Sequence, residues 1–342
     1  MDDLICCTRN AVLRGIEWLI RRQNADGSFA DCGNELVSTY KAPLAFAVSG
    51  NVEAGIRCLR YIKTNNFNAG GELSSAGGGV KTTFLGNQRN FANYMDGWVA
   101  IGAWLLGDLE LATRICERLL PQLAAHGGIP TGPGKWSGTS RYDILTNASI
   151  GRAFLHTGMR DAACSVADFL CEVVTGAHQR TPDAALDMSF DASWNHVEPN
   201  DPSDRVYYRF IFEQRGERVF CPAFACAFLC EIAQVRDKAR YLDAAGKYLS
   251  AIFRTPEYLD QSLSNGKSGW AAGMLAVAGG GVTAKQAALQ IIPKMLARQR
   301  DDGEFAAAAG ADQTPLAKRL ESTAEHVAWA LEYQRILTLL GL

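Results

Sequence analysis

The amino-acid sequence predicts an all-α protein that folds as a single (α/α)6 toroid over residues 1–342. About twelve segments repeat apolar residues with the period of a helix, and no segment shows a convincing strand pattern. The segments form six pairs, with short links inside each pair and long links between pairs. Six buried helices ringed by six amphipathic helices would make the toroid. An open solenoid of stacked hairpins is the alternative.

The opening helix, residues 5–22, is expected to pair with the closing helix, residues 321–339. The other helices pair in chain order. These pairs are 38–49 with 52–63, 93–106 with 109–124, 142–156 with 160–175, 220–233 with 238–253, and 268–278 with 284–298. The first helix of each pair is rich in small residues and apolar on nearly every face, as in AFAVSG and CPAFACAFLC. Such a composition is typical of a buried helix. The second carries Arg, Glu and Lys on one face and belongs outside.

Two similar stretches stand near opposite ends of the chain, RGIEWLIRRQNADGSF at 14–29 and MLARQRDDGEF at 295–305. Each has a glutamine, a glycine four residues later and an aromatic residue two after that. These residues are Gln23, Gly27 and Phe29, and Gln299, Gly303 and Phe305. A glutamine at a helix end can bond open backbone groups while the aromatic ring fills the gap beneath. The stretches therefore indicate clamps between helices of a repeating array, and their positions favour a closed ring.

The first stretch resembles the QW repeat of squalene and terpenoid cyclases, which also occurs in protein prenyltransferase β subunits. The match runs from Arg14 through Trp18 and Gln23 to Gly27, with Phe29 where the family usually has Trp. The resemblance implies the helical toroid but does not specify the reaction. The sequence lacks the Asp-x-Asp-Asp run of squalene-type cyclases and the Asp-x-Cys pair that holds zinc in the prenyltransferases. We therefore predict no metal, no cofactor and no protein prenylation.

Composition and charge exclude several classes of partner. A chain of 342 residues with 48% hydrophobic content can bury a large core, and its net charge of −2 gives no basic excess for nucleic acid. No apolar run approaches the roughly 20 residues of a membrane span. The start, MDDLICCTRN, does not read as a signal peptide, so we expect a cytoplasmic monomer or homodimer with its ten cysteines reduced.

The long links are expected to lie on one face, over the N-termini of the inner helices. A cavity there is the expected active site. The longest link, about 181–218, would close over it as a lid or contact a partner. Polar residues in the first turns of the inner helices, among them Lys41, Glu321 and Lys267, should line the cavity. The residues expected to contact substrate are Tyr40, Tyr94, Trp98, Tyr142, Asn147, Cys221, Trp270, Glu325 and Trp329.

Three residues are predicted to be catalytic. Asp96 starts an apolar helix, where desolvation would raise its pKa and suit a general acid, although it could simply bond helix N–H groups. Asp143 is a similar candidate, with Arg141 beside it as a possible ion-pair partner. His326, one turn into an apolar helix, would be a base or acid, or a core residue.

The cysteine and the tryptophans among the expected substrate-contact residues can also be explained by structural roles. Cys221 starts a helix whose dipole would lower the pKa of its thiol, or it is an inert small residue. The tryptophans could stabilise a cation or pack in the core.

These residues favour a metal-independent enzyme that uses acid/base chemistry to cyclise, isomerise or dehydrate a mostly apolar small molecule, terpenoid or polyketide-like. A carbohydrate epimerase or lyase of the (α/α)6 type is the alternative, and it predicts a cavity lined by Arg, His, Glu and Trp. A third possibility is a toroid without catalysis that binds a peptide or protein.

Overall fold

The computed structural model describes residues 2–30, 32, 36–67, 71–73, 91–132, 140–176, 178–256, 265–305 and 314–342. Their contacts divide into two compact units. Unit 1 comprises Met1–Arg89, Met95–Arg118 and Pro293–Leu342, and unit 2 comprises Asn90–Tyr94 and Leu119–Ile292. The single domain over 1–342 stays a prediction. Most of the predicted long links, among them 66–92, 254–267 and 299–320, lie partly outside the described residues.

Each predicted helix is present in the described part of the chain. The helices are α1 (Asp2–Ile20), α2 (Ala42–Val48), α3 (Val52–Asn65), α4 (Ala92–Leu105), α5 (Leu109–Leu119), α6 (Ile144–His156), α7 (Arg160–Val174), α8 (Phe220–Ile232), α9 (Lys238–Phe253), α10 (Asn265–Val277), α11 (Gly281–Leu296) and α12 (Leu316–Leu339). Short 3-10 helices cover Leu36–Ser38, Leu120–Gln122 and Pro202–Tyr207. The bounds differ most at α12, which begins five residues earlier than predicted, directly after Pro315, and at α5, which ends five residues earlier than predicted.

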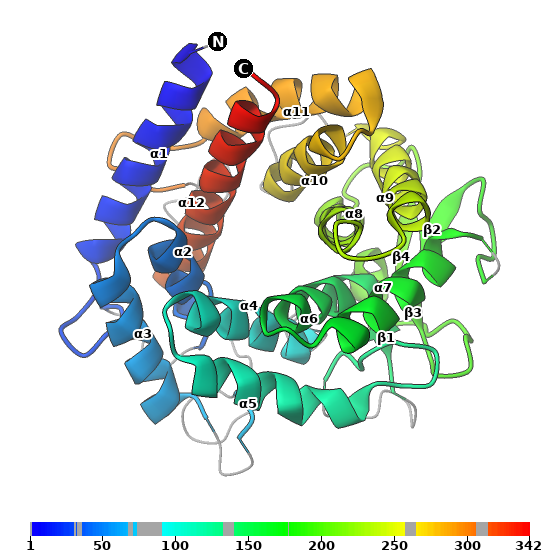
Figure 1. Ribbon diagram of the computed structural model, residues 1–342, viewed down its shortest axis with the longest axis horizontal. Helices are drawn as coiled ribbons and strands as arrows, with labels where there is room; N and C mark the ends of the chain where they lie inside the picture. The colour runs from blue at the N-terminus through cyan, green and yellow to red at the C-terminus, as the bar shows by residue number, and fades with distance from the viewer. Residues whose placement is uncertain are drawn as a thin grey trace. The chain divides into compact units, whose positions relative to one another are not determined.

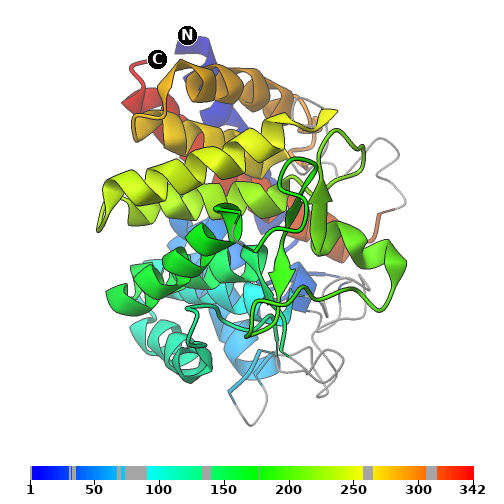
Figure 2. The same cartoon turned by 90° about the vertical axis from the view of Figure 1, so that its right-hand side faces the viewer.

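The expectation of a chain without strands is wrong for four short segments of unit 2. Strand β1 (Tyr142–Asp143) pairs antiparallel with β3 (Ser189–Phe190), and β2 (Ala185–Asp187) pairs antiparallel with β4 (Arg209–Ile211). In register, Tyr142 lies opposite Phe190, and Leu186 lies opposite Phe210. Strands of two or three residues are too short to show a period of two in the sequence. Much of the predicted 181–218 link is therefore a small ordered structure, visible as green arrows in Figure 2.

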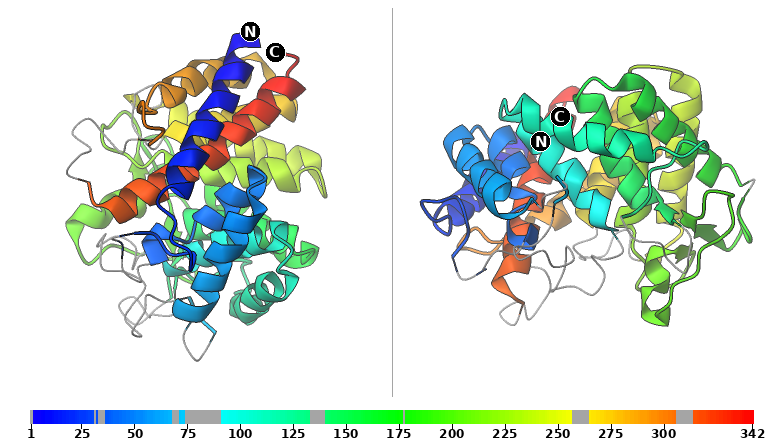
Figure 3. Two further views of the ribbon diagram at one scale, coloured as in Figure 1. Left: turned by 90° about the vertical axis from the view of Figure 1, so that its left-hand side faces the viewer. Right: turned by 90° about the horizontal axis from the view of Figure 1, so that it is seen from below.

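Unit 1 contains two of the predicted helix pairs. Helix α1 lies beside α12, and α3 lies against α2, as Figure 1 and the left view of Figure 3 show. Helix α2 also packs on α12, so these two form one layer and α1 and α3 form the other. The apolar face of α1 is buried through Trp18 and Leu19. Helix α4 approaches α2 so closely that a Cβ at Gly102 would lie 2.8 Å from the backbone nitrogen of Leu44.

Unit 2 has the same two-layer arrangement. Helices α6, α8 and α10 pack side by side, while α7 covers α6 and α9 covers α8. Figure 2 shows α8 and α9 running next to each other. As its sequence predicts, α8 is buried on all sides, and Ala225, Cys226 and Phe228 are fully buried. The close packing of α6 on α8 requires Gly151, whose added Cβ would lie 2.4 Å from the Phe228 ring.

The two QW-like stretches fold as predicted, into tight turns that clamp neighbouring helices. Gln23 Nε2 donates to the carbonyl of Ala54 in α3, and Gln299 Nε2 donates to the carbonyl of Ala11 in α1. In each turn the backbone of the glutamine pairs with the aromatic residue six positions later. The glycines are required: Gly303 has φ +99°, and a Cβ there would lie 2.3 Å from the Arg14 carbonyl oxygen.

A third turn of the same design, at residues 124–129, was not recognised in the sequence. Gly127 has φ +86°, and its added Cβ would lie 2.2 Å from the carbonyl oxygen of Ser165 in α7. The nitrogen of Ala124 donates to the carbonyl of Gly128, as Asn24 does to Ser28 in the first turn. Leu123 stands where the other two turns have glutamine, so the glutamine motif does not identify this turn.

Candidate functional site

Four of the predicted substrate-contact residues come together in unit 1 around Lys41. The Lys41 side chain, only 3% exposed, lies at the start of α2 with its Nζ 2.8 Å from Glu321 Oε1. The same Nζ forms an ion pair with Glu325 Oε2. Glu321 and Glu325 are one turn apart on α12, so both carboxylates face the same side of that helix. The cluster places a buried ammonium between two carboxylates.

Aromatic side chains enclose this ammonium. Tyr40 donates its hydroxyl hydrogen to Glu321 Oε1 at 2.5 Å, and Trp329 Nε1 donates to Glu325 Oε1 at 3.2 Å. The Trp98 ring lies edge-to-face with Trp329 and with Tyr40, at centroid distances of 5.5 and 6.4 Å. Lys41 Nζ lies 5.2 Å from the ring centroids of both Tyr40 and Trp98. The cation is thus held by ion pairs and by ring faces.

The two carboxylates of the cluster differ in environment. Burial would raise the pKa of Glu321, but Lys318 and Lys41 outweigh it and lower this pKa to about 2. Glu321 is therefore ionised at neutral pH. The side chain of Glu325 is more exposed, at 12% against 5% for Glu321. A carboxylate, an ammonium and a phenol within hydrogen-bond reach of one another can take up and return protons.

Lys318 was not among the predicted site residues. It forms an ion pair with Glu321, three positions later on α12. The helix predicted from the sequence begins at residue 321, so Lys318 lies outside it. The spacing of three residues within one helix was the signal that could have identified the pair.

Asp96 is fully buried on α4, and its carboxylate faces α5. Its Oδ1 lies 2.9 Å from Arg118 Nη2, near the end of α5. A buried carboxylate that is paired in this way favours the structural role over that of a general acid.

His326 lies one residue after Glu325, but its side chain contacts different residues. Its Nδ1 lies 2.6 Å from the carbonyl oxygen of Ser322, and its ring stacks on Phe305 with centroids 5.2 Å apart. Phe305 is the aromatic residue of the second QW-like turn. The imidazole therefore packs against that turn, while Glu325 faces Lys41 and Trp329.

In unit 2, the side chains of Asp143 and Asn147 form hydrogen bonds with backbone groups. Asp143 is the N-cap of α6 and accepts hydrogen bonds from the nitrogen of Thr146 and the hydroxyl of Thr131, both at 2.8 Å. Asn147 accepts from the Ile129 nitrogen at 2.7 Å and donates to the Ile129 carbonyl at 3.0 Å. Asn147 thereby fixes the third turn against α6. Both geometries favour structural roles over substrate contact.

The other predicted residues of unit 2 lie among aromatic rings. Tyr142 packs edge-on against His126 at 4.6 Å, and Tyr94 packs against Phe224 at 6.0 Å. The guanidinium of Arg152 lies 4.6 Å from the centroid of the Trp270 ring.

Of the two explanations offered for Cys221, the structure favours the inert small residue. The lowering of its thiol pKa by the helix dipole is not seen, because burial raises this pKa. The side chain is only 2% exposed, so a thiolate there would lose its solvation.

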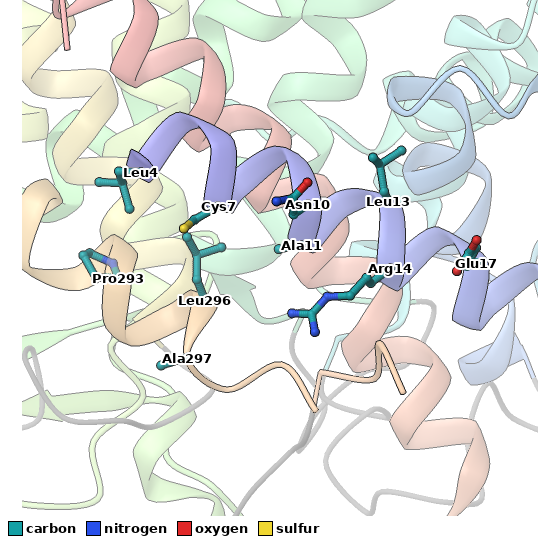
Figure 4. A pocket seen from close by; sticks show the side chains of 10 residues that line it. All are labelled: Leu4, Cys7, Asn10, Ala11, Leu13, Arg14, Glu17, Pro293, Leu296 and Ala297. Atoms are coloured by element: carbon teal, nitrogen blue, oxygen red, sulfur yellow. The ribbon is translucent and has the colours of Figure 1, made fainter. Parts of the chain in front are cut away.

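A separate groove of about 790 Å³ lies in unit 1 between α1 and the end of α11 (Figure 4). No predicted site residue lines it. Its lining consists of Leu4, Cys7, Asn10, Ala11, Leu13, Arg14, Glu17, Pro293, Leu296 and Ala297.

No protein-family model and no curated protein sequence matches the chain. Several solved structures match its fold. A D-mannose isomerase superposes with a TM-score of 0.68 at 12% identity, covering 95% of this chain and 96% of that one. A cellobiose 2-epimerase from Bacillus thermoamylovorans gives 0.69 at 10% identity, covering 96% and 99%. A variant of the type II terpene cyclase MstE from Scytonema, in complex with geranylgeranyl dihydroxybenzoate, gives 0.62 at 14% identity, covering 98% and 100%.

The fold class is that of the α/α toroids. The neighbours share it over nearly their whole length, and the described part of the chain is mostly helical. Within the described residues, no helix is both long and apolar enough to cross a membrane. The same residues contain no group of three or more His, Cys, Asp or Glu side chains arranged to hold a metal ion.

Proposed function

We propose that this chain is an enzyme that isomerises or epimerises a sugar by proton transfer at the Lys41 cluster. The observation that carries the proposal is the burial of Lys41 between Glu321 and Glu325, with the Tyr40 hydroxyl hydrogen-bonded to Glu321. Such a site suits a polar substrate better than an aliphatic one, because it offers charged hydrogen-bonding groups. A D-mannose isomerase and a cellobiose 2-epimerase with the same fold support this substrate class.

Each member of the cluster has a distinct role in this proposal. Glu325, the more exposed carboxylate, removes the proton from the carbon next to the sugar carbonyl. Lys41 then lies next to the negative charge that develops on the carbonyl oxygen and stabilises it. Glu321, whose pKa is about 2, stays ionised and keeps the ammonium charged and in place. Return of the proton to the former carbonyl carbon gives the isomer, while Lys41 gives a proton to the former carbonyl oxygen and takes one from the adjacent hydroxyl. Return of the proton to the same carbon, on the other face of the intermediate, gives the epimer.

Deuterium exchange tests this proposal directly. The full chain is incubated with D-mannose, and separately with cellobiose, in deuterated water, and the products are followed by proton NMR. We expect deuterium to replace the hydrogen next to the carbonyl in at least one sugar. Glu325→Gln should lower the exchange rate about 10²–10⁴-fold. Glu17→Gln, an exposed glutamate of α1, is the matched control and should exchange at the wild-type rate.

Two results would contradict the proposal. One is an absence of exchange with a panel of aldoses and disaccharides. The other is an exchange rate that Glu325→Gln leaves unchanged, because the base would then lie elsewhere.

A second function is favoured by one observation, the edge-to-face array of Tyr40, Trp98 and Trp329. Aromatic faces stabilise cations, which form when an apolar polyene cyclises. The MstE variant, solved with geranylgeranyl dihydroxybenzoate, has the same fold. In this reading Asp96 would be the acid. Incubation with a prenylated aromatic acid should then give a product of equal mass and altered retention, and Trp329→Leu should abolish it while Trp329→Phe retains it.

A further inference from the structure

One tryptophan of unit 2 has a backbone conformation that bulky residues rarely adopt. Trp194 lies in the 181–218 link with φ +64°. This left-handed conformation is costly for such a residue and persists only where the surrounding contacts hold it. Within the turn, Asp191 Oδ1 accepts hydrogen bonds from the nitrogens of Ser193 at 2.8 Å and Asn195 at 2.9 Å. These bonds are local, so the packing of the turn on α7 depends on the indole of Trp194.

Two imidazoles and two phenyl rings surround this indole. The His178 ring is parallel to it, with centroids 4.2 Å apart and an interplanar angle of 2°. Phe169 of α7 stacks on it at 5.3 Å, and Phe190 of β3 lies edge-on at 5.5 Å. The ring of His126, from the third turn, lies 5.1 Å away. Trp194 thus joins the 181–218 link both to α7 and to the third turn.

His126 accepts a hydrogen bond that requires an unprotonated ring nitrogen. The backbone nitrogen of Gly128 donates to its Nδ1 at 3.1 Å. A backbone nitrogen can only donate, so Nδ1 carries no hydrogen and the hydrogen of the neutral ring is on Nε2. That Nε2 is buried beside the backbone of Asp191. A second proton would therefore go to Nδ1, where the new N–H would face the N–H of Gly128.

Neighbouring rings confine the imidazole of His126. Tyr142 of β1 lies edge-on to it at 4.6 Å, and Phe169 lies 5.1 Å away. A Cβ added at Gly128 would lie 2.8 Å from the imidazole carbon Cε1 and 3.0 Å from the Tyr142 ring, so the ring lies directly on the turn. A protonated imidazole would have to leave this position, and Trp194 would then lose part of its support.

The surroundings of His126 disfavour its protonated form. Burial lowers the pKa of His126 below its ordinary value of 6.5, and the nearby Asp191 offsets this only in part. The groups that face the imidazole from β1 and α7, Tyr142 and Phe169, carry no charge at neutral pH. A released imidazole would titrate at the ordinary pKa, so the released form binds the proton more readily. The packed form is therefore fully favoured above pH 6.5 and becomes less favoured as the pH falls below it.

We propose that His126 is a proton-sensitive latch, which holds Trp194 and the 191–195 turn on α7 at neutral pH and releases them in acid. Histidine suits this role because its charge changes between about pH 5 and 8. Protonation of His178 would act in the opposite direction, since a cation is attracted to the face of an indole. Release would loosen the 181–218 link, the segment predicted to be a lid. The latch belongs to unit 2 alone and does not depend on the reaction proposed for Lys41.

Hydrogen–deuterium exchange on the full chain, followed by mass spectrometry, tests the latch. Protection factors are measured at pH 7.5 and pH 5.5, corrected for the intrinsic pH dependence of exchange, in peptides that cover residues 124–130 and 191–196. We expect both segments to lose protection by about 3- to 10-fold at the lower pH, because the released form binds one more proton. A peptide from the buried helix α8 is the internal control and should keep its protection.

Two variants identify the titrating group. His126→Asn should keep the protection of both segments at both pH values, because an amide oxygen can accept from the nitrogen of Gly128 without titrating. His178→Phe keeps a ring against Trp194 and should lose protection as the wild type does. Circular dichroism checks that each variant is folded, and His126→Gln replaces His126→Asn if that variant does not fold.

Three results would overturn the proposal. The wild type could keep its protection at pH 5.5, which would mean that the turn is not released. The variant His126→Asn could lose as much protection as the wild type, which would assign the effect to another group. The variant His178→Phe could abolish the loss, which would make His178 the titrating residue.

Discussion

The side-chain oxygen of Gln299 accepts a hydrogen bond from Arg14 Nη2 at 2.6 Å, across 285 residues of sequence. The same arrangement joins Gln23 to Arg57 Nη2 at 3.0 Å. In both turns the amide nitrogen of the glutamine also bonds a helix carbonyl, so each glutamine is held from two sides. The QW-like stretches are therefore helix clamps within unit 1, and their glycines can be tested separately from their glutamines.

Gly303→Ala should destabilise the protein more than Gly279→Ala. Both glycines have positive φ, +99° and +104°, so both variants carry the strain of a left-handed backbone. Only at Gly303 would the new Cβ also meet a backbone oxygen, that of Arg14, at 2.3 Å. We expect Gly279→Ala to cost about 1–2 kcal/mol and Gly303→Ala more than that. Urea unfolding of both variants provides the measurement, and equal losses would show that the contact with Arg14 does not matter.

Glu321 should make the protein more stable at neutral than at acid pH. Its pKa is about 2 in the folded protein and 4.5 ordinarily, so the unfolded chain binds the proton more readily. The stabilisation is complete above pH 4.5 and is lost as the pH falls through 2. Between pH 6 and pH 3 it should decline by about 2 kcal/mol. Urea unfolding at both values should show a smaller decline for Glu321→Gln. An equal decline in the variant would assign the acid sensitivity to other carboxylates.

Lys41→Met should destabilise the protein more than Lys41→Met combined with Glu321→Gln and Glu325→Gln. Removing Lys41 alone leaves the buried Glu321 and the nearby Glu325 without their shared partner. Breaking a buried ion pair costs about 3–5 kcal/mol. The triple variant leaves neutral amides of similar shape and should recover part of that loss. Thermal unfolding of the single and triple variants checks this. No recovery would mean that Lys41 contributes mainly through its packing on Tyr40 and Trp98.

Asp96→Asn should lower stability and leave turnover within a few-fold of the wild-type value. The reason is the ion pair with Arg118, which gives the carboxylate a structural partner on α5. Turnover is measured with the sugar that the deuterium assay identifies, on variant protein shown to be folded. Arg118→Gln serves as the matched variant and should behave in the same way. A fall of 10²-fold or more for Asp96→Asn alone would restore Asp96 as the general acid.

The helices could be predicted because their apolar residues repeat with period 3.6 over ten or more residues. The QW-like turns could be predicted because glutamine, glycine and aromatic residue keep one spacing. The turn at 124–129 was missed because Leu123 stands where the other turns have glutamine, although Gly127 has the same role. The strands were missed because each has only two or three residues.

The candidate site could be predicted in part. Position near the start of an inner helix was enough to group Tyr40, Trp98, Glu325 and Trp329, which the structure brings together. The same position was not enough to predict where the side chains of Asp96 and His326 point, since a side chain near a helix start can face several neighbours. Arg118 and Phe305 decide those orientations, and both lie about twenty residues away in the sequence. Such pairs become visible only when the helices are packed.

The pairing of α1 with α12 governs the order in which the chain can fold during synthesis. Residues 119–292 are nearly the whole of unit 2, so that unit can become compact while the ribosome is still making α12. Helix α1, made first, must wait with Trp18 and Leu19 uncovered until its partner emerges. The earliest segment is thus among the last to be buried, and a circular permutant that places α1 directly after α12 should refold faster than the natural order of segments.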